Sequence, residues 1–524
     1  MKKKSNINAI SSEEQYMKAV FCILDGCSTE GFEWALRNEI EKQLIKADWF
    51  YRQLNYAFYS HSITSFPTIT PTEHASLLTG TYPDNHGIPG MKWYDRKKQD
   101  MENYFFIGEL EGKPGLIPAL KRFLRWMPRI GDGIDDLVDI ISNTHLSQNV
   151  LTIFEAIDPD NTFCFKEFIR RGANNYDVDL IAHLLDKVNL QTLKQFLNHK
   201  YQDKSSPDLI VYWKIYTDQK AHRSGPQSRQ LRKEVINGLK RAKDIISFYL
   251  DRKEPVLLVV TADHGQSKIT EKDPVGFENS VKRFKKTQTQ NIKVQIADNG
   301  RFVYFYLDPD SPAIRHALVS ELANERPIDL IFYKDTNNQI QVIHCLQTEI
   351  IRQPLASISL SNDMYPNAVE RITRIMDSKR AGDILISLKE GYSTHEKKKG
   401  DHGSLISGDS LVPLLIHPFK GKDERLPLVS NRFRRGFQIY QTAIQQSRII
   451  RRRPIERFEL DPEEFQSYID IVPTILSYLN PACYSAKYQE NPRIFPGDSI
   501  RERIEDYYQS PRYKVLPPSL HLGI

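Results

Sequence analysis

Three strongly apolar segments, each followed closely by carboxylate or imidazole side chains, constrain the fold of this chain more than any other feature. They are residues 19–24, ending at Asp25; residues 209–213, followed by Asp218 and His222; and residues 255–261, followed by Asp263 and His264. Apolar runs of this length are typical of strands buried on both faces of a sheet. Because open α/β sheets bind ligands at the carboxyl ends of their strands, we expect these polar side chains to meet at one edge.

A fourth cluster, Asp401-His402-Gly403, precedes the apolar run 411–416. Carboxylate oxygen and imidazole nitrogen are the ligands that a zinc-like dication prefers, so the four clusters predict a metal site. Two assignments stay open. His395 is a rival for the role of His402, and Asp401 either binds the metal or accepts a hydrogen bond that orients an imidazole.

Asp218 and His222 are four residues apart, a spacing that also suits a pair on the surface of a helix. The preceding strand ends only a few residues earlier, and Gly225-Pro226 closes the stretch. These neighbours favour a loop or a single helical turn.

The segment 66–88, FPTITPTEHASLLTGTYPDNHGI, has the pattern of a helix start. Thr70 is predicted as the cap, with Pro71 at the first helical position and Glu73 three residues after the cap. A hydroxyl in the positive field of a helix N-terminus favours an alkoxide and a bound phosphate. A cap without chemistry is the alternative. His74, like His61 and His86, is given a helix-end or turn role and no role as a ligand.

Taken together, these motifs resemble the alkaline phosphatase superfamily, and within it the type I phosphodiesterase/nucleotide pyrophosphatase branch. The resemblance rests on Asp25, P-T-x-T at 67–70, LLTGTYPDNHGI at 77–88, D-x-x-x-H-x-x-G-P at 218–226, Asp263-His264-Gly265, Asp401-His402-Gly403 and YIDIVPTILSYL at 468–479. It implies an α/β fold: an alkaline-phosphatase-like sandwich with a largely parallel central sheet flanked by helices, plus a small α+β cap insertion.

The resemblance also implies a site with two divalent metal ions, Zn²⁺ being expected and Mn²⁺ the alternative. The first ion would be held by Asp25, Thr70, Asp263 and His264, and the second by Asp218, His222 and His402. Thr70 would be the nucleophile and would form a threonyl phosphoester. The implied activity is that of a phosphodiesterase or nucleotide pyrophosphatase acting on a small molecule. The alternatives are a phosphomonoesterase or phosphonate hydrolase with the same metals, and a non-catalytic member that binds anionic lipid or nucleic acid.

One position departs from the branch. Its members carry Asn shortly after the H-G-I turn, where the amide helps to hold a phosphate oxygen, whereas this chain has Met91 there. Losing such a donor costs on the order of a hundredfold in rate, unless Lys92 or a backbone N–H replaces it. The chain has no C-x-P-x-R motif, which disfavours a sulfatase.

The alternation of apolar and polar segments predicts how the chain is divided. Two stretches form the catalytic core, and a helical, lid-like insertion spans about 96–150, which includes the amphipathic residues 116–124. Strand-like pieces such as 302–307 and 328–333 predict the cap, and residues 383–387 are expected to return the chain to the core. The predicted ranges are 1–16 (tail), 17–267 and 381–500 (core), 268–380 (cap) and 501–524 (tail).

Composition limits the partners and the compartment. Five cysteines form an odd number without C-x-x-C spacing, which favours a reducing compartment. We read neither a signal peptide nor a membrane-spanning run, so a cytoplasmic location is expected. The net charge of +6 is mild, but arginines gather between Arg432 and Arg453. Such a run is typical of a solvated face; the alternative is a patch for an anionic surface.

Overall fold

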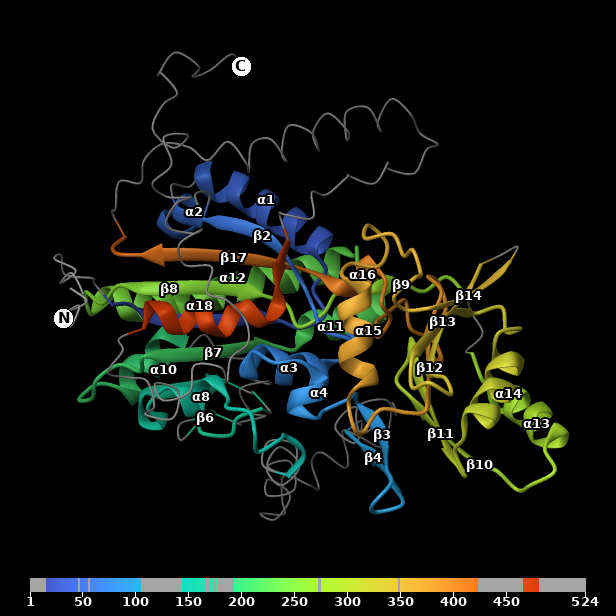
Figure 1. The fold of residues 1–524 in the computed structure, drawn as a ribbon. Coiled ribbons are helices and arrows are strands. Elements are labelled where there is room, and N and C mark those ends of the chain that lie inside the picture. Colours follow the sequence, from blue (N-terminus) through green and yellow to red (C-terminus); the bar gives the residue numbers. More distant parts are fainter. Residues whose placement is uncertain are drawn as a thin grey trace, which may run out of the picture.

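The apolar segments of the sequence form the middle of an eight-stranded sheet with the order β18-β2-β17-β8-β1-β7-β5-β6 (Figure 1). The computed structural model describes residues 16–422 and 465–479, except 46–47, 55–56, 105–143, 166, 168, 174–175, 178–192, 272–274 and 347–348. The strands are β1 (Lys18–Leu24), β2 (Phe58–Ile63), β5 (Thr162–Phe165), β6 (Tyr176–Asp177), β7 (Leu209–Lys214), β8 (Val256–Thr261), β17 (Leu411–Phe419) and β18 (Phe465–Ser467).

The three central strands, β8, β1 and β7, are parallel and in close register. Phe21 of β1 pairs with Val259 of β8 on one side and with Val211 of β7 on the other. Every residue of β7 and β8 is buried, as expected for strands covered on both faces. The strand β17 runs antiparallel to both of its neighbours. The other neighbouring strands are parallel to each other, so the sheet is largely parallel, as expected.

Helices cover both faces of this sheet. The long helix α12 packs on β1 and β8 and contacts α1 and α10, while α18 packs on the same strands and contacts α3 (Figure 1). The helices of this unit are α1 (Thr29–Ile45), α2 (Trp49–Leu54), α3 (Thr70–Thr79), α4 (Pro83–His86), α8 (Ile153–Ala156), α10 (Leu193–Lys200), α11 (Tyr216–Ser224), α12 (Arg229–Asp251), α16 (Ser407–Ser410) and α18 (Ile471–Tyr478), with the 3-10 turns η2 (Pro159–Asn161) and η4 (Tyr468–Asp470).

A second, antiparallel sheet lies beside the carboxyl ends of the central strands, on the right in Figure 1. Its six strands have the order β10-β11-β15-β12-β13-β14. They are β10 (Lys293–Asp298), β11 (Phe302–Asp308), β12 (Ile328–Lys334), β13 (Ile340–Cys345), β14 (Ile350–Pro354) and β15 (Ile384–Leu388), with helices α13 (Glu278–Thr287), α14 (Pro312–Leu322) and α15 (Ala368–Met376).

The predicted boundary of the cap at residue 380 is wrong. We expected residues 383–387 to return the chain to the core, but β15 lies between β11 and β12 in the second sheet. All five residues of β15 are buried. A central strand of either sheet therefore has the same apolar pattern, and that pattern alone does not reveal which sheet the strand joins.

Side chains from β11 alternate between two apolar clusters, one on each face of the second sheet. Val303 and Phe305 pack in a cluster with residues of α13 and α14. Phe302 and Tyr304 pack in another cluster, which also contains Phe66 from the segment before α3. The rings of Phe66 and Phe302 lie 5.0 Å apart, edge to face. The second sheet thus supports the segment that leads to Thr70.

Thr70 is not the cap of α3, contrary to the prediction. The helix begins at Thr70 itself, its N-cap is Ile69, and no side chain caps it. The N–H of Glu73 is satisfied by the Ile69 carbonyl at 3.0 Å. The Glu73 carboxylate accepts hydrogen bonds from the N–H and hydroxyl of Ser65, so a capping box does not form.

Three further regions differ from the expected pattern or lie outside the described residues. Asp218 and His222 lie on the nine-residue helix α11, not in a loop. The predicted insertion begins with a hairpin of β3 (Lys92–Asp95) and β4 (Asp100–Asn103), while residues 116–124 fall outside the described part. The arginines between 432 and 453 also fall outside it. The same holds for residues 1–15 of the predicted N-terminal tail and for the predicted C-terminal tail, 501–524.

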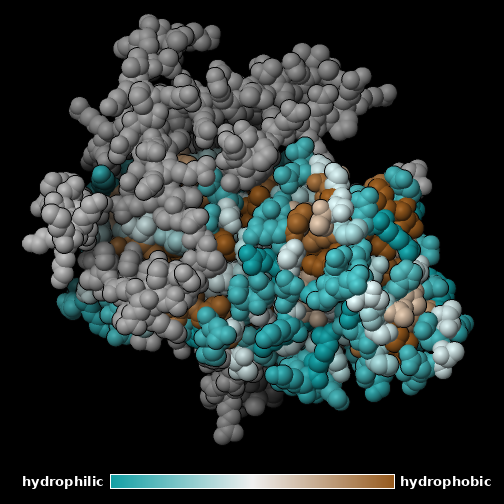
Figure 2. Space-filling model, in the orientation of Figure 1, coloured by the Kyte–Doolittle hydropathy of each residue, from teal (hydrophilic) through white to brown (hydrophobic). Residues whose placement is uncertain are grey.

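The surface around the second sheet and its helices, on the right in Figure 2, is mostly hydrophilic with a few hydrophobic areas. Its most exposed large hydrophobic side chains are Leu346, Ile350 and Val369. Among the described residues, no helix combines the length and the apolar character needed to cross a membrane.

Candidate functional site

Five segments bring polar side chains to the carboxyl edge of the central strands. Two short strands, β9 (Ser267–Lys268) and β16 (Gly400–Asp401), pair antiparallel and bring the segment after β8 next to the segment before α16. The predicted ligands come from the turn after β1 (Asp25), the start of α3 (Thr70), α11 (Asp218 and His222), the turn after β8 (Asp263 and His264) and the residue after β16 (His402).

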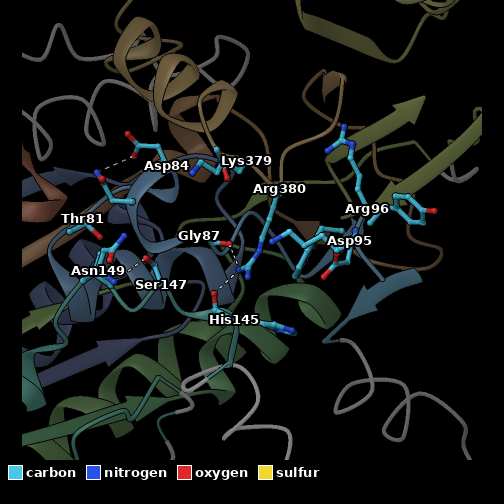
Figure 3. A pocket seen from close by; sticks show the side chains of 16 residues that line it. Thr81, Asp84, Gly87, Asp95, Arg96, His145, Ser147, Asn149, Lys379 and Arg380 are labelled. Carbon is cyan, nitrogen blue, oxygen red and sulfur yellow. Dashed lines mark hydrogen bonds between the residues drawn. The ribbon is translucent and has the colours of Figure 1, made fainter. Parts of the chain in front are cut away.

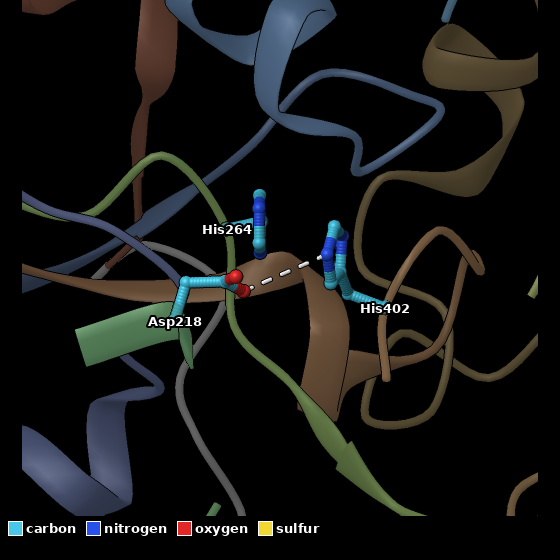
Figure 4. Close-up of side chains that lie close together, drawn as sticks. All are labelled: Asp218, His264 and His402. Carbon is cyan, nitrogen blue, oxygen red and sulfur yellow. Dashed lines mark ion pairs between the residues drawn. The ribbon is translucent and has the colours of Figure 1, made fainter. Parts of the chain in front are cut away.

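Ligand atoms of these residues and of Asp401 form three overlapping groups, in each of which all atoms lie within 4.8 Å of one another. One group is Asp25, Asp263 and His264; the second is Asp218, His264 and His402; the third is His222, Asp401 and His402. Figure 4 shows the second group, in which Asp218 Oδ1 and His402 Nε2 are 3.7 Å apart. All the predicted carboxylate and imidazole ligands therefore lie in one continuous cluster.

Each imidazole of the cluster is held through Nδ1 by a backbone carbonyl. His222 bonds to Gly400 at 2.7 Å, His402 to Thr68 at 2.8 Å and His264 to Gly265 at 2.9 Å. Because a carbonyl only accepts, Nδ1 carries the proton in every case. Nε2 is then free to act as a ligand, which is the arrangement that metal-binding histidines adopt.

Two carboxylates of the cluster, those of Asp25 and Asp263, are buried and only partly satisfied. Asp25 Oδ1 and Asp263 Oδ2 have no hydrogen-bond partner among the described residues. Burial, together with the charges of Asp263 and Asp218, raises the pKa of Asp25 well above its usual value. Buried acceptors that repel one another are costly without a cation, so the donor set fits a dication such as Zn²⁺.

The hydroxyl of Thr70 lies inside this cluster. Thr70 Oγ1 is 3.0 Å from His264 Nε2, and since Nδ1 of that ring carries the proton, the hydroxyl donates to Nε2. His264 Nε2 is also 3.3 Å from Asp263 Oδ2 and 3.7 Å from Asp25 Oδ1. The side chain of Thr70 thus points at the group that contains Asp25 and not at the backbone of its own helix.

His395 does not take the place of His402 in these groups. Its Nδ1 lies 3.0 Å from Asp401 Oδ2, while Lys398 approaches Asp401 Oδ1 at 3.2 Å. Asp401 Oδ1 also lies 3.7 Å from Nδ1 of His222. Asp401 therefore faces the proton-bearing side of that ring, where it is able to orient the imidazole.

Three residues around the cluster were not expected from the sequence. Gln266 donates a hydrogen bond to Asp218 Oδ1. Its position in the sequence, two residues after the predicted ligand His264, indicates a residue close to the site. His74 is fully buried between Glu167 and Asp263, with Nδ1 2.9 Å from the carboxylate of Glu167 and Nε2 3.5 Å from that of Asp263. Burial lowers the pKa of His74, but the charge of Glu167 and the contacts with both acids outweigh burial and raise the pKa to about 9.

The corner expected to hold a phosphate oxygen is built differently from the predicted pattern. Met91 is half-buried and packs against the main apolar core. The backbone N–H of Lys92 donates to Asn299 Oδ1 at 2.8 Å, and Asn299 Nδ2 donates to the Lys92 carbonyl at 2.9 Å. The amide of Asn299 is thus engaged by backbone and does not replace the missing donor.

A cavity of about 850 Å³ lies elsewhere, between α4, β3, residues 145–150 and the loop before β15 (Figure 3). Arg380 enters it, donates to the carbonyls of Gly87 and His145, and lies 4.7 Å from the ring centre of Trp93. None of the described residues that line this cavity belongs to the predicted metal set. The cavity and the cluster are separate features.

Comparisons with known proteins identify a family for this chain. The family described as type I phosphodiesterase / nucleotide pyrophosphatase matches residues 28–410. An alkaline phosphatase PhoD of Zymomonas mobilis is 22% identical over 231 residues, which cover 41% of this chain and 38% of that protein. The chain therefore aligns with little more than a third of this curated relative.

Among solved structures, inactive murine ectonucleotide pyrophosphatase / phosphodiesterase 5 in complex with AMP has a TM-score of 0.50 at 11% identity, covering 90% of this chain and 100% of that one. Phosphonoacetate hydrolase from Sinorhizobium meliloti has a TM-score of 0.47 at 14% identity, covering 77% and 90%. The likeness to the murine protein, at 11% identity, shows a similar fold and nothing further.

Proposed function

Since the chain belongs to the type I phosphodiesterase/nucleotide pyrophosphatase family, whose members are phosphoester hydrolases, we propose that it hydrolyses small-molecule phosphodiesters or pyrophosphates with Thr70 as the nucleophile. The observation that carries this proposal is the direction of the imidazoles. Each keeps Nδ1–H on a carbonyl and presents Nε2 to a carboxylate, Asp218 for His222 and His402 and Asp263 for His264. The Thr70 hydroxyl lies among them.

The residues divide between two ions as follows. Asp25, Thr70, Asp263 and His264 hold one, and Asp218, His222 and His402 hold the other, with Zn²⁺ as the ion that suits this oxygen and nitrogen set. Two such dications lower the pKa of a bound hydroxyl or water and compensate the charge on phosphate oxygens. His264 of the first set shares a group with Asp218 and His402 of the second, so it lies where the two halves of the site meet.

Thr70 Oγ1 loses its proton and attacks phosphorus, the bond from phosphorus to the ester oxygen breaks, and the leaving oxygen takes up a proton. Water then hydrolyses the threonyl phosphoester that remains. The position of Thr70 at the first residue of α3 favours this step, because the unpaired N–H groups of a helix start carry positive partial charge towards an anion. Since the Thr70 side chain caps nothing, its hydroxyl is available for chemistry.

The test combines metal analysis with turnover of paired substrates. Purified protein should contain two equivalents of zinc and cleave an aryl phosphodiester faster than the matching aryl phosphomonoester. Preference for the monoester would instead favour a phosphomonoesterase, and protein that binds no dication and turns over neither ester would refute the proposal.

A pair of matched variants tests the nucleophile. Thr70→Ala should lower turnover by at least about a thousandfold while zinc content and fold persist. Thr72→Ala is the control, because Thr72 is buried on the same helix and its hydroxyl has no hydrogen-bond partner among the described residues. Near-normal activity of Thr70→Ala would show that a metal-bound hydroxide attacks instead.

A further inference from the structure

A carboxylate and an imidazole lie fully buried behind the first set of ligands. His74 is on α3, one turn after Thr70, and its Nδ1 is 2.9 Å from Glu167 Oε2. On the other side of the ring, Nε2 is 3.5 Å from Asp263 Oδ2. The side chains of His74, Glu167 and Asp263 all have zero exposed surface.

Neighbouring groups hold Glu167 and the ring of His74 in place. The N–H of Ile169 donates to Glu167 Oε1 at 3.0 Å, which holds the carboxylate in place. The ring of Trp213 meets the ring of His74 edge to face, with 4.6 Å between ring centres. His74 therefore has one neighbour that sets its direction and another that limits its tilt.

Asp263 is held from two sides. Its Oδ1 accepts hydrogen bonds from the N–H groups of Gly26 and His264, both at 2.9 Å. Its Oδ2 faces His264 Nε2 and lies against His74 Nε2. The first oxygen is thus anchored to the backbone, and the direction of the second depends on His74.

We propose that His74, anchored by Glu167, is a positioning residue that aims Asp263 Oδ2 at the first metal ion. The inference rests on the proposed function, because it takes Asp263 as a metal ligand. It assigns no ligand role to His74 and no chemical step.

A purely structural role predicts a different outcome. Replacing a buried polar or ionic pair by apolar side chains of similar volume is often neutral or stabilising. A pair kept only for packing could therefore be exchanged without loss of metal affinity. A pair kept for positioning loses metal affinity whatever happens to stability, and partners of this kind typically contribute about 10–100-fold.

The experiment titrates metal-free protein with Zn²⁺ and measures affinity calorimetrically. A His222→Ala background disables the second set, so that the titration reports the first site alone. In that background His74→Leu should weaken zinc binding by about 10–100-fold. His74→Gln should recover much of the loss, because its amide N–H reaches towards Asp263 from near the Nε2 position. Glu167→Gln should fall between them, since it keeps an acceptor for Nδ1 but removes the charge.

The matched control is His86→Gln. His86 is as buried as His74 and contacts the same helix through Ser76 Oγ at 3.0 Å, but its hydrogen bonds within the described part of the chain go to Ser76 and Ile88, neither of which is a predicted ligand. The variant should leave zinc affinity unchanged even if it lowers the melting temperature. Near-ultraviolet circular dichroism verifies the fold of each variant.

Two results overturn the inference. One is an unchanged first-site affinity in folded His74→Leu protein, and the other is an equal loss in His86→Gln. Failure of the proposed function looks different, because the wild-type chain itself would then bind no zinc at either site.

Discussion

Gly26 shows how a single residue controls the site. Its φ of +62° is a left-handed conformation that favours glycine, and a Cβ there would lie 2.7 Å from Asp218 Oδ1. Its N–H also donates to Asp263 Oδ1. One glycine therefore sits between carboxylates assigned to different metal ions, and any side chain at this position would push them apart.

Gly26→Ala should therefore weaken zinc binding at both sites and lower the free energy of unfolding by about 1–3 kcal/mol, the range of backbone strain at such positions. Zinc titration and urea unfolding measure the two effects. Gly421→Ala is the control, because a Cβ at Gly421 would meet nothing within 4 Å. Wild-type zinc affinity in Gly26→Ala would mean that Asp218 moves aside freely.

Met91 belongs to the same scale. Because its side chain packs against the main apolar core, Met91→Asn should remove buried apolar surface and lower stability by about 1–2 kcal/mol. We expect no gain in turnover of a phosphodiester, whereas Met91→Leu should keep both stability and rate. A severalfold faster Met91→Asn enzyme would place residue 91 at the phosphate and restore the corner predicted from the family pattern.

At the scale of elements, His86 of α4 is hydrogen-bonded to α3, and its protonation is unfavourable in the folded state. His86 Nε2 is 3.0 Å from Ser76 Oγ, and His86 Nδ1 accepts from the N–H of Ile88 at 3.2 Å. Burial and the charge of Arg380 lower the pKa of His86 to about 3. The neutral ring thus satisfies both contacts, and the charged ring breaks one of them.

The sign of the pH dependence follows from this lowered pKa. Well above pH 6.5 His86 is neutral in both the folded and the unfolded state, and the folded state suffers no penalty. Between pH 6.5 and about 3 the unfolded chain binds a proton that the folded chain refuses, so stability falls with falling pH. At pH 5 the loss from this group is about 2 kcal/mol.

Urea unfolding of metal-free protein at about pH 7.5 and about pH 5 measures this effect. His86→Gln should lose less stability over that interval than the wild-type chain, although it starts from a lower value. An identical loss in both proteins would show that His86 is not the group that titrates on unfolding.

At the scale of the whole molecule, buried arginines of the unit around the second sheet donate hydrogen bonds to segments that carry site residues. Arg371 of α15 is buried and donates to the Ser65 carbonyl at 2.8 Å, just before the segment that leads to Thr70. Arg301, beside β11, donates to both oxygens of Asp409 at 2.8 and 2.7 Å. Asp409 lies in α16, shortly after His402. The second sheet therefore stabilises two of the segments that carry site residues.

Metal removal should be felt by the whole fold. Without a cation, the buried carboxylates of Asp25 and Asp263 lie together, and the charge of Asp218 also repels that of Asp25. Treatment with a chelator should lower the melting temperature, and added Zn²⁺ should restore it. Each ion present at a hundred times its dissociation constant adds about 2.7 kcal/mol to the free energy of unfolding. Scanning calorimetry with and without zinc measures the shift. An Asp25→Asn/Asp218→Asn variant should respond much less, and an unchanged wild-type melt would argue against bound metal.

The sequence by itself determined the central strands and the edge at which the polar side chains gather. Strands such as β7 and β8 are recognised locally, because residues 209–213 and 256–260 are continuously apolar, and the structure buries every residue of both strands. The carboxylate or imidazole that follows such a strand must lie at its carboxyl end, whatever the rest of the chain does. For this reason local pattern alone was enough to place Asp25, Asp263 and His264 together.

Only the tertiary structure decided the partners of these elements. The sheet that β15 joins depends on β11 and β12, which lie far from it in the sequence. Thr70 has the local pattern of a cap, but its hydroxyl goes to His264, since the Ile69 carbonyl already satisfies Glu73 N–H. Glu167 has no motif at all, because its role arises from a contact with His74 across 93 positions of the chain. Local patterns encode elements and edges, whereas contacts between distant segments exist only once the chain has packed.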